Sequence, residues 1–118
     1  MESNTIKKRP PYVKKGQTRG PKLEDILADI AIIFKQPLDK IKSEDKHAEL
    51  VLCRRIYCHV SRQITNAPFR EIGELINKDH SNALYHNSLV EHWIKVCDPL
   101  FYDEWLEYKQ NSKIWGIY

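Results

Sequence analysis

The stretch from Pro68 to Leu89, PFREIGELINKDHSNALYHNSL, constrains the fold more than any other part of the sequence. Its first part, Pro68 to Ile76, has the apolar spacing of a short amphipathic helix, and proline suits the first turn because an N–H there would have no partner. The polar pair Asn77 and Lys78 follows, and a second helix is predicted to begin at Asp79. Two helices joined by so short a turn form a helix-turn-helix, whose second helix can lie in the major groove of DNA.

The polar residues that open this second helix allow two interpretations. In a recognition helix, the first turns face base edges. The residues that we expect to contact bases are Lys78, Asp79, His80, Ser81, Asn82 and Leu84. Leu84 could contact a thymine methyl group, or it could be a single exposed leucine of the kind that most proteins carry. The alternative to recognition is a simple corner between two helices, in which Asp79 is only an N-cap.

Basic residues are concentrated near the amino terminus. Residues 1–22 contain seven Lys or Arg and one Glu, a net charge of +6, whereas residues 23–118 contain twelve Lys or Arg and fifteen Asp or Glu, a net charge of −3. Because residues 1–22 also contain three prolines and two glycines, we predict a basic arm that is disordered until it meets a partner. Lys14, Lys15 and Arg19 would then contact phosphates or the minor groove. Alternatively, the arm only aids solubility.

Length and composition indicate one soluble domain. The chain has 118 residues, of which 42% are hydrophobic and 30% charged. No apolar run approaches the ~20 residues that cross a bilayer, and the sequence does not begin with the apolar segment of a signal peptide, so we expect no membrane contact. Three cysteines, all within helix-like sequence, favour reduced thiols in a cytoplasmic protein.

Apolar periodicity predicts an all-α domain over residues 23–118, with five to six helices in total. We expect helices at Leu23–Lys35 and Pro99–Gln110, a single turn at Leu38–Ile41, and the longest helix at Ser43–Thr65, with Ser43 as its N-cap. An apolar ladder on this longest helix would face the core: Leu52, Ile56, Val60 and Ile64. The aromatic residues of the carboxy-terminal end would close the core or form a dimer contact.

The helix that begins at Asp79 should bury a stripe from Ala83 to Cys97. We place His86 beside this stripe, as a core histidine with a satisfied hydrogen bond, and Asn87 on the opposite, polar face. Gly73 lies inside the preceding helix, where glycine costs about 1 kcal/mol relative to alanine. We therefore expect a close approach between two helices at Gly73.

Three arginines of the longest helix are further candidates for DNA contact: Arg54, Arg55 and Arg62. Arg55 and Arg62 are seven residues apart and share a face opposite the apolar ladder, while Arg54 lies on a flank. Such a row of positive charges could cross a phosphate backbone, although most such charges are only solvated.

Neither metal binding nor catalysis is indicated. His80, His86 and His92 are spaced by six residues, which scatters them around a helix, and Cys53 and Cys58 lack the spacing of zinc ligands. We therefore expect no enzyme activity, no cofactor, no metal and no small-molecule substrate.

Three blocks of sequence, in this order, carry a resemblance to a known family: RRIYCHVSRQIT from Arg54 to Thr65, then Glu71–Gly73, then Lys78–Ser81. Together they resemble the carboxy-terminal DNA-binding domain of the bacterial replication initiator DnaA, here as a stand-alone domain. The resemblance implies a bundle of the Trp-repressor-like type that binds specific double-stranded DNA sequences, associates with the nucleoid, and acts in replication or its regulation. It further implies that Asp79–Ser81 contact bases, that Arg54 reaches the minor groove, and that Arg62 faces phosphates. No G-x-x-x-x-G-K-[ST] motif is present, so we expect no ATPase module.

Departures from the family pattern alter the predicted recognition surface. A single Asn77 replaces a pair of glycines, which shortens the turn by one residue, and the family's second Thr and its Val are Asn82 and Ala83. Asn82 could add a bidentate contact to adenine. A protein-interaction module that binds a replication or transcription protein without contacting DNA is the alternative function.

Overall fold

Six helices make up the part of the chain that the structure, a computed structural model, describes, namely residues 21–116. They are α1 (Leu23–Phe34), α2 (Leu38–Ile41), α3 (Ala48–Thr65), α4 (Phe69–Leu75), α5 (His80–Val96) and α6 (Pro99–Asn111). No strand occurs among these residues, so the prediction of an all-α domain with five to six helices is confirmed. The basic arm, residues 1–22, was predicted to be disordered. Residues 1–20 lie outside the described residues, so this stays a prediction.

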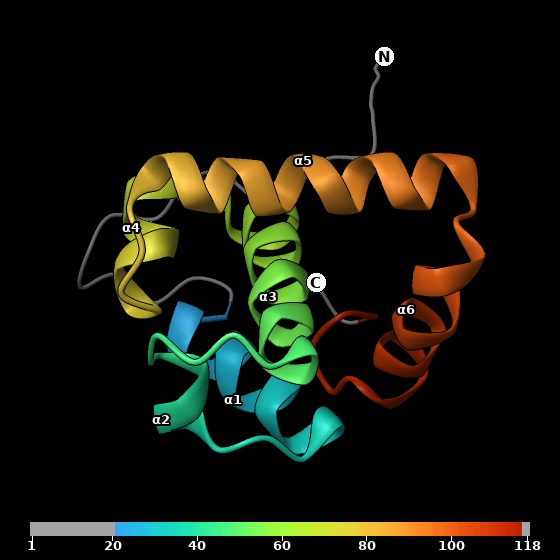
Figure 1. Ribbon diagram of the computed structural model, residues 1–118, viewed down its shortest axis with the longest axis horizontal. Coiled ribbons are helices and arrows are strands. Elements are labelled where there is room, and N and C mark those ends of the chain that lie inside the picture. The colour runs from blue at the N-terminus through green and yellow to red at the C-terminus, as the bar shows by residue number, and fades with distance from the viewer. Residues whose placement is uncertain (1–20, 117–118) are drawn as a thin grey trace.

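The long helix α5 lies along one edge of the molecule, with the other helices on one side of it (Figure 1). The helix α3 crosses beneath its middle, α4 packs at its amino-terminal end, and α6 turns back from its carboxy-terminal end. The helices α1 and α2 pack against α3 on the side away from α5. This arrangement leaves the outer face of α5 uncovered by any other described helix.

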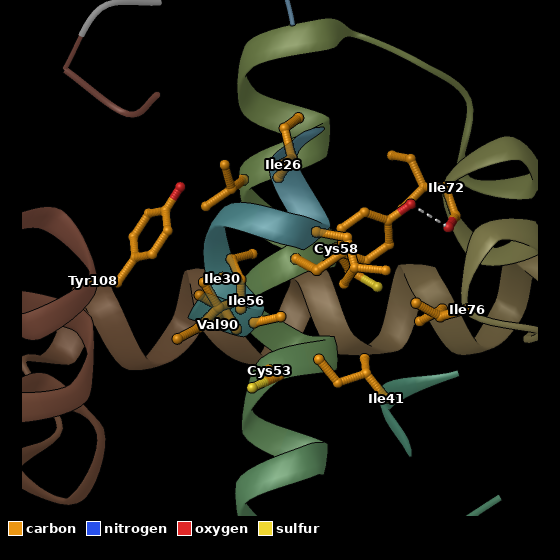
Figure 2. Close-up of a cluster of buried hydrophobic side chains, with 14 of the residues drawn as sticks. Ile26, Ile30, Ile41, Cys53, Ile56, Cys58, Ile72, Ile76, Val90 and Tyr108 are labelled. Carbon is orange, nitrogen blue, oxygen red and sulfur yellow. Dashed lines mark hydrogen bonds between the residues drawn. The ribbon is translucent and has the colours of Figure 1, made fainter. Parts of the chain in front are cut away.

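The core forms where α1, α3, α4 and α5 meet. The predicted ladder of α3 is largely correct, since Ile56, Val60 and Ile64 are buried and Leu52 packs half-buried against them. Figure 2 shows Ile30 and Val90 beside Ile56, and Cys53 and Cys58 in the same apolar cluster. Burial raises the pKa of the Cys53 thiol to about 12 and that of Cys58 further, so both thiols stay protonated.

Two local predictions about helix ends were wrong. Ser43 does not cap α3, because its hydroxyl donates to the Lys40 carbonyl (2.6 Å) and accepts from the Asp45 N–H (3.0 Å) in a loop that delays the helix until Ala48. Cys97 does not join the buried stripe of α5 either. It is the exposed C-cap of that helix, in the left-handed conformation with φ 54°.

Contacts between aromatic rings hold α6 against the rest of the domain. Trp105 is buried, stacks between Phe101 and Tyr108, and meets the edge of Trp115 at 5.2 Å between ring centroids. His59 of α3 approaches the same ring at 5.5 Å. The expectation that the carboxy-terminal aromatic residues close the core is therefore confirmed for the described residues.

Candidate DNA-binding interface

The turn between α4 and α5 is a Schellman-type helix ending. The Lys78 N–H donates to the Gly73 carbonyl (2.9 Å) and the Asn77 N–H donates to the Glu74 carbonyl (3.1 Å). Asn77 adopts φ 60°, the left-handed conformation that Asn tolerates better than most residues with a side chain. A single Asn77 can therefore end α4 and turn the chain directly into α5.

Gly73 is required by the turn rather than by a second helix. A Cβ at this position would lie 2.6 Å from the Lys78 carbonyl oxygen and 2.9 Å from that of Asp79, both backbone atoms. The predicted close approach is therefore present, but the turn itself makes it. Because these two carbonyls lie in the space that a side chain at position 73 would fill, the start of α5 packs closely against α4.

Asp79 is the N-cap of α5. Its carboxylate Oδ1 accepts from the Asn82 N–H at 2.9 Å, which satisfies a donor that the helix itself leaves free. Asp79 is nevertheless exposed, as are His80 and Ser81 in the first turn. Asp79 thus caps α5 and is also exposed to solvent at the start of the helix.

The exposed residues of α5 form one continuous face. At 100° per residue, the buried positions Ala83, His86 and Val90 share one side of the helix. The opposite side consists of exposed residues: His80, Ser81, Leu84, Tyr85, Ser88, Glu91, His92 and Lys95. Leu84 is 46% exposed and Tyr85 56% exposed, so this face is polar with an apolar centre near its first two turns.

Two of the predicted base-contacting side chains do not lie on this face. Asn82 is half-buried and its Oδ1 is inaccessible to solvent, so the proposed bidentate contact with adenine would require its side chain to rotate. The Lys78 side chain is 15% exposed, and its Nζ lies 3.3 Å from Glu44 Oε1. In this structure the Lys78 side chain is thus directed toward Glu44 rather than toward the outer face of α5.

Arg54, which the resemblance places at the minor groove, is in the interior of this structure. It is 3% exposed, and its guanidinium donates to the carbonyls of Ile41 (2.7 Å), Lys40 (3.1 Å) and Ser43 (3.0 Å). A buried guanidinium needs such acceptors because desolvation without them is costly. Arg54 therefore holds α2 and the following loop onto α3 in this structure, and a contact with the minor groove would require its side chain to leave these carbonyls.

Arg55 and Arg62 are half-buried and both make internal contacts. Arg55 Nε donates to His86 Nδ1 at 3.4 Å, and its Cζ lies 5.3 Å from the centre of the Trp93 ring. Arg62 Nη1 donates to the Ala67 carbonyl at 2.8 Å, with its Cζ 4.7 Å from the centre of the Phe69 ring. Neither is the freely solvated charge that the helical spacing suggested.

Two histidines are buried as neutral groups. Burial, helped by the nearby Arg55, lowers the pKa of His86 to about 4, and the expected core position of His86 is confirmed. Asn87 was predicted on the polar face but is buried, with its Oδ1 3.0 Å from Nδ1 of His59. Burial also lowers the pKa of His59.

Two features are absent from the described residues. Across residues 21–116, no three His, Cys, Asp or Glu side chains gather where they could hold a metal ion. Nor does any helix in this range have the length and apolarity to span a membrane.

Two exposed residues of the helix-turn-helix were not among the predicted contacts. Tyr85 follows Leu84 on the outer face of α5, and the helical period alone could have placed it beside Ser81 and Ser88. Arg70 is exposed on α4, the helix that in this motif crosses the DNA backbone. The predicted arm residues Lys14, Lys15 and Arg19 lie outside the described residues.

Comparison with known proteins gives the same family that the sequence blocks suggested. The family model described as "Bacterial dnaA protein helix-turn-helix" matches residues 23–90. The chromosomal replication initiator protein DnaA 2 of Chlamydia pneumoniae is 30% identical over 78 residues, which cover 66% of this chain and 17% of that protein. DnaA of Citrifermentans bemidjiense is 32% identical over 83 residues, which cover 70% of this chain and 18% of that protein.

The chain thus spans less than a fifth of the length of these relatives. No solved structure matches it. The family match contains α1 to α4, the turn and the part of α5 up to Val90, and it ends before α6. On this match, the chain belongs to the bacterial DnaA helix-turn-helix family.

Proposed function

We propose that this protein binds specific sequences of double-stranded DNA through the outer face of α5 and acts in the initiation of replication or in its regulation. The observation that carries the proposal is the exposure of His80, Ser81 and Leu84 on the first turns of the second helix of a helix-turn-helix. No second layer of described structure covers this face, so it is free to enter a major groove.

The side chains of this face have the chemistry of base contact. The His80 ring and the Ser81 hydroxyl can donate to or accept from base edges, and Leu84 can pack on a thymine methyl. Asp79 has a second carboxylate oxygen besides the one that caps α5, and this oxygen could accept from cytosine N4. Sequence preference would come from these few residues.

Phosphate contacts would come from outside the recognition helix. Arg70 is exposed on α4, and the half-buried residues Arg55 and Arg62 could add to it. Because residues 23–118 have a net charge of −3, we propose that residues 1–22, at +6, supply much of the attraction to DNA through Lys14, Lys15 and Arg19. Such a protein would act in the bacterial cytoplasm, on the nucleoid, without catalysis or cofactor.

The test begins with selection of bound duplexes from a random pool, followed by measurement of affinity for the selected duplex and for a scrambled one. His80→Ala should weaken binding to the selected duplex by about 1–3 kcal/mol, the range for one lost base contact. His92→Ala is the matched control, since His92 is an exposed histidine three turns further along α5. Equal losses for both variants would argue against recognition by the first turn.

Salt dependence separates the arm from the recognition helix. Deleting residues 1–20 keeps Lys22, whose carbonyl accepts the first hydrogen bonds of α1, and removes six Lys or Arg. We expect this deletion to weaken binding to all duplexes similarly and to flatten the salt slope, because fewer counterions are released. Loss of discrimination alone would contradict the assignment of the arm to phosphates.

The protein-interaction module is the second candidate. It is favoured by the exposed apolar pair Leu84 and Tyr85, and by the engagement of the α3 arginines in internal contacts. The two functions separate at low salt, where phosphate contacts are strongest. Failure to bind every duplex tested at low salt would favour a protein partner.

A further inference from the structure

The loop after α2 lies between a buried arginine and the turn of the helix-turn-helix. Four consecutive carbonyls, from Lys40 to Ser43, point to donors from elsewhere in the fold. Arg54 takes those of residues 40, 41 and 43, at 2.7 to 3.1 Å. The remaining one, that of Lys42, accepts from Asn77 Nδ2 at 2.9 Å.

The turn is therefore held from two sides. On one side, the carbonyls of Lys78 and Asp79 lie close against Gly73 of α4. On the other side Asn77 is bonded to the Lys42 carbonyl, and the neighbouring Lys78 ammonium lies 3.3 Å from the Glu44 carboxylate. We call residues 40–44, together with Arg54, Asn77 and Lys78, the brace.

The two ends of the brace differ in accessibility. Arg54 is fully enclosed and fixes the loop to α3, whereas Asn77 is exposed and sits two residues before the N-cap of α5. A shift of the Asn77 backbone would therefore be passed on directly to Asp79 and His80. None of the atoms in the brace needs to touch DNA for this effect.

We propose that Asn77 is a positioning residue: its bond to the Lys42 carbonyl sets the position of the first turn of α5, and discrimination between DNA sequences depends on that bond. The inference rests on the proposed function and adds to it a residue that acts through others. Asn has both properties that the position needs, tolerance of φ 60° and a side-chain donor. Glycine would supply only the first.

The chain contains a matched control for this substitution. Asn66 is also in the left-handed conformation, at φ 61°, as the C-cap of α3. Within residues 21–116, the Asn66 side chain makes no hydrogen bond, whereas the Asn77 side chain donates to the Lys42 carbonyl. Asn77→Gly and Asn66→Gly therefore make the same chemical change at the same backbone conformation, and they differ in the loss of the brace.

The experiment measures the ratio of affinities for the selected and scrambled duplexes, in the full chain, by fluorescence anisotropy at fixed salt, with melting temperatures recorded alongside. For Asn77→Gly we expect this ratio to fall by about three- to ten-fold, the range that one net hydrogen bond represents. For Asn66→Gly we expect the ratio of the wild type. Partial unfolding would lower both affinities equally and leave the ratio unchanged, so a purely structural role is distinguishable.

Three outcomes would contradict the proposals. An unchanged ratio in Asn77→Gly, with wild-type discrimination intact, would overturn the positioning role and leave the proposed function standing. An equal fall in both variants would also overturn it, because added backbone freedom would then be the cause. A wild-type chain that binds neither duplex would overturn the proposed function, and the positioning role with it.

Discussion

The two ends of α5 are built in opposite ways. At the amino-terminal end, the inner face packs on α4 through a tight turn, and the outer face exposes His80, Ser81 and Leu84. At the carboxy-terminal end, Trp93 lies 5.2 Å from Phe101, between ring centroids, and joins the aromatic residues that hold α6. One end is shaped by backbone contacts, and the other is stabilised by buried aromatic surface.

This difference suggests that recognition and stability are separated along one helix. Aromatic rings bury large apolar areas, so the α6 end should contribute strongly to the free energy of folding. At the turn end, the close approach of the Lys78 and Asp79 carbonyls to Gly73 fixes the positions of atoms that would face DNA. Substitutions at the two ends should therefore affect different measurements.

The largest expected effect is at the aromatic end. Trp105→Ala should lower the free energy of unfolding by about 3–5 kcal/mol, because it leaves a cavity among Phe101, Tyr108 and Trp115. Urea denaturation measures this loss, and Leu100→Ala, at a position 88% exposed, should change stability by less than about 0.5 kcal/mol. If the variant still folds, its ratio of affinities for selected and scrambled duplexes should equal that of the wild type. A reduced ratio would show that the two ends are coupled.

A smaller effect is expected at the turn. Gly73→Ala places a Cβ 2.6 Å from a backbone oxygen, and this clash should cost about 1–3 kcal/mol in spite of the better helix propensity of alanine. Because the turn must move to relieve the clash, discrimination between duplexes should fall as well. Gly116→Ala, where a Cβ would meet nothing within 4 Å, is the control. Lost stability with unchanged discrimination would mean that the turn does not control the first turn of α5.

The sequence predicted the helices well because their burial follows a simple period. The ladder of α3 and the exposed positions His80, Ser81 and Leu84 all follow from 3.6 residues per turn. The tight turn was equally predictable, since Asn is among the residues that favour turns and tolerate the left-handed conformation that Asn77 adopts.

What could not be predicted depends on contacts between distant parts of the chain. Arg54 has the spacing of a flank residue, and only the fold brings three carbonyls from residues 40–43 to it. Asn87 likewise is buried because His59, 28 residues earlier, reaches its amide oxygen. Local periodicity shows which way a side chain points, but it does not show which residue from a distant part of the chain the side chain contacts.

The smallest expected effect concerns His86, which lies between the two ends of α5 and accepts a hydrogen bond from Arg55. Its pKa is about 4 in the folded protein and 6.5 without the fold, so between these values the unfolded chain binds a proton that the folded chain does not. Stability should therefore fall as pH is lowered from 6.5 toward 4, by at most about 1.4 kcal/mol per pH unit for this group. The buried His59 acts in the same direction, whereas His47, whose pKa is raised by Asp45, acts in the opposite one from an exposed position.

Urea denaturation at pH 7, 6 and 5 measures this slope, and His86→Gln should make it shallower, since glutamine takes up no proton. His92→Gln, at an exposed position on the same helix, should leave the slope as it is in the wild type. Because Arg55 of α3 also lies over the Trp93 ring, loss of its bond to His86 at low pH would weaken the contact between α3 and α5. A wild-type slope in His86→Gln would instead mean that His86 does not contribute to the pH dependence of stability, and that its pKa is not lowered by burial.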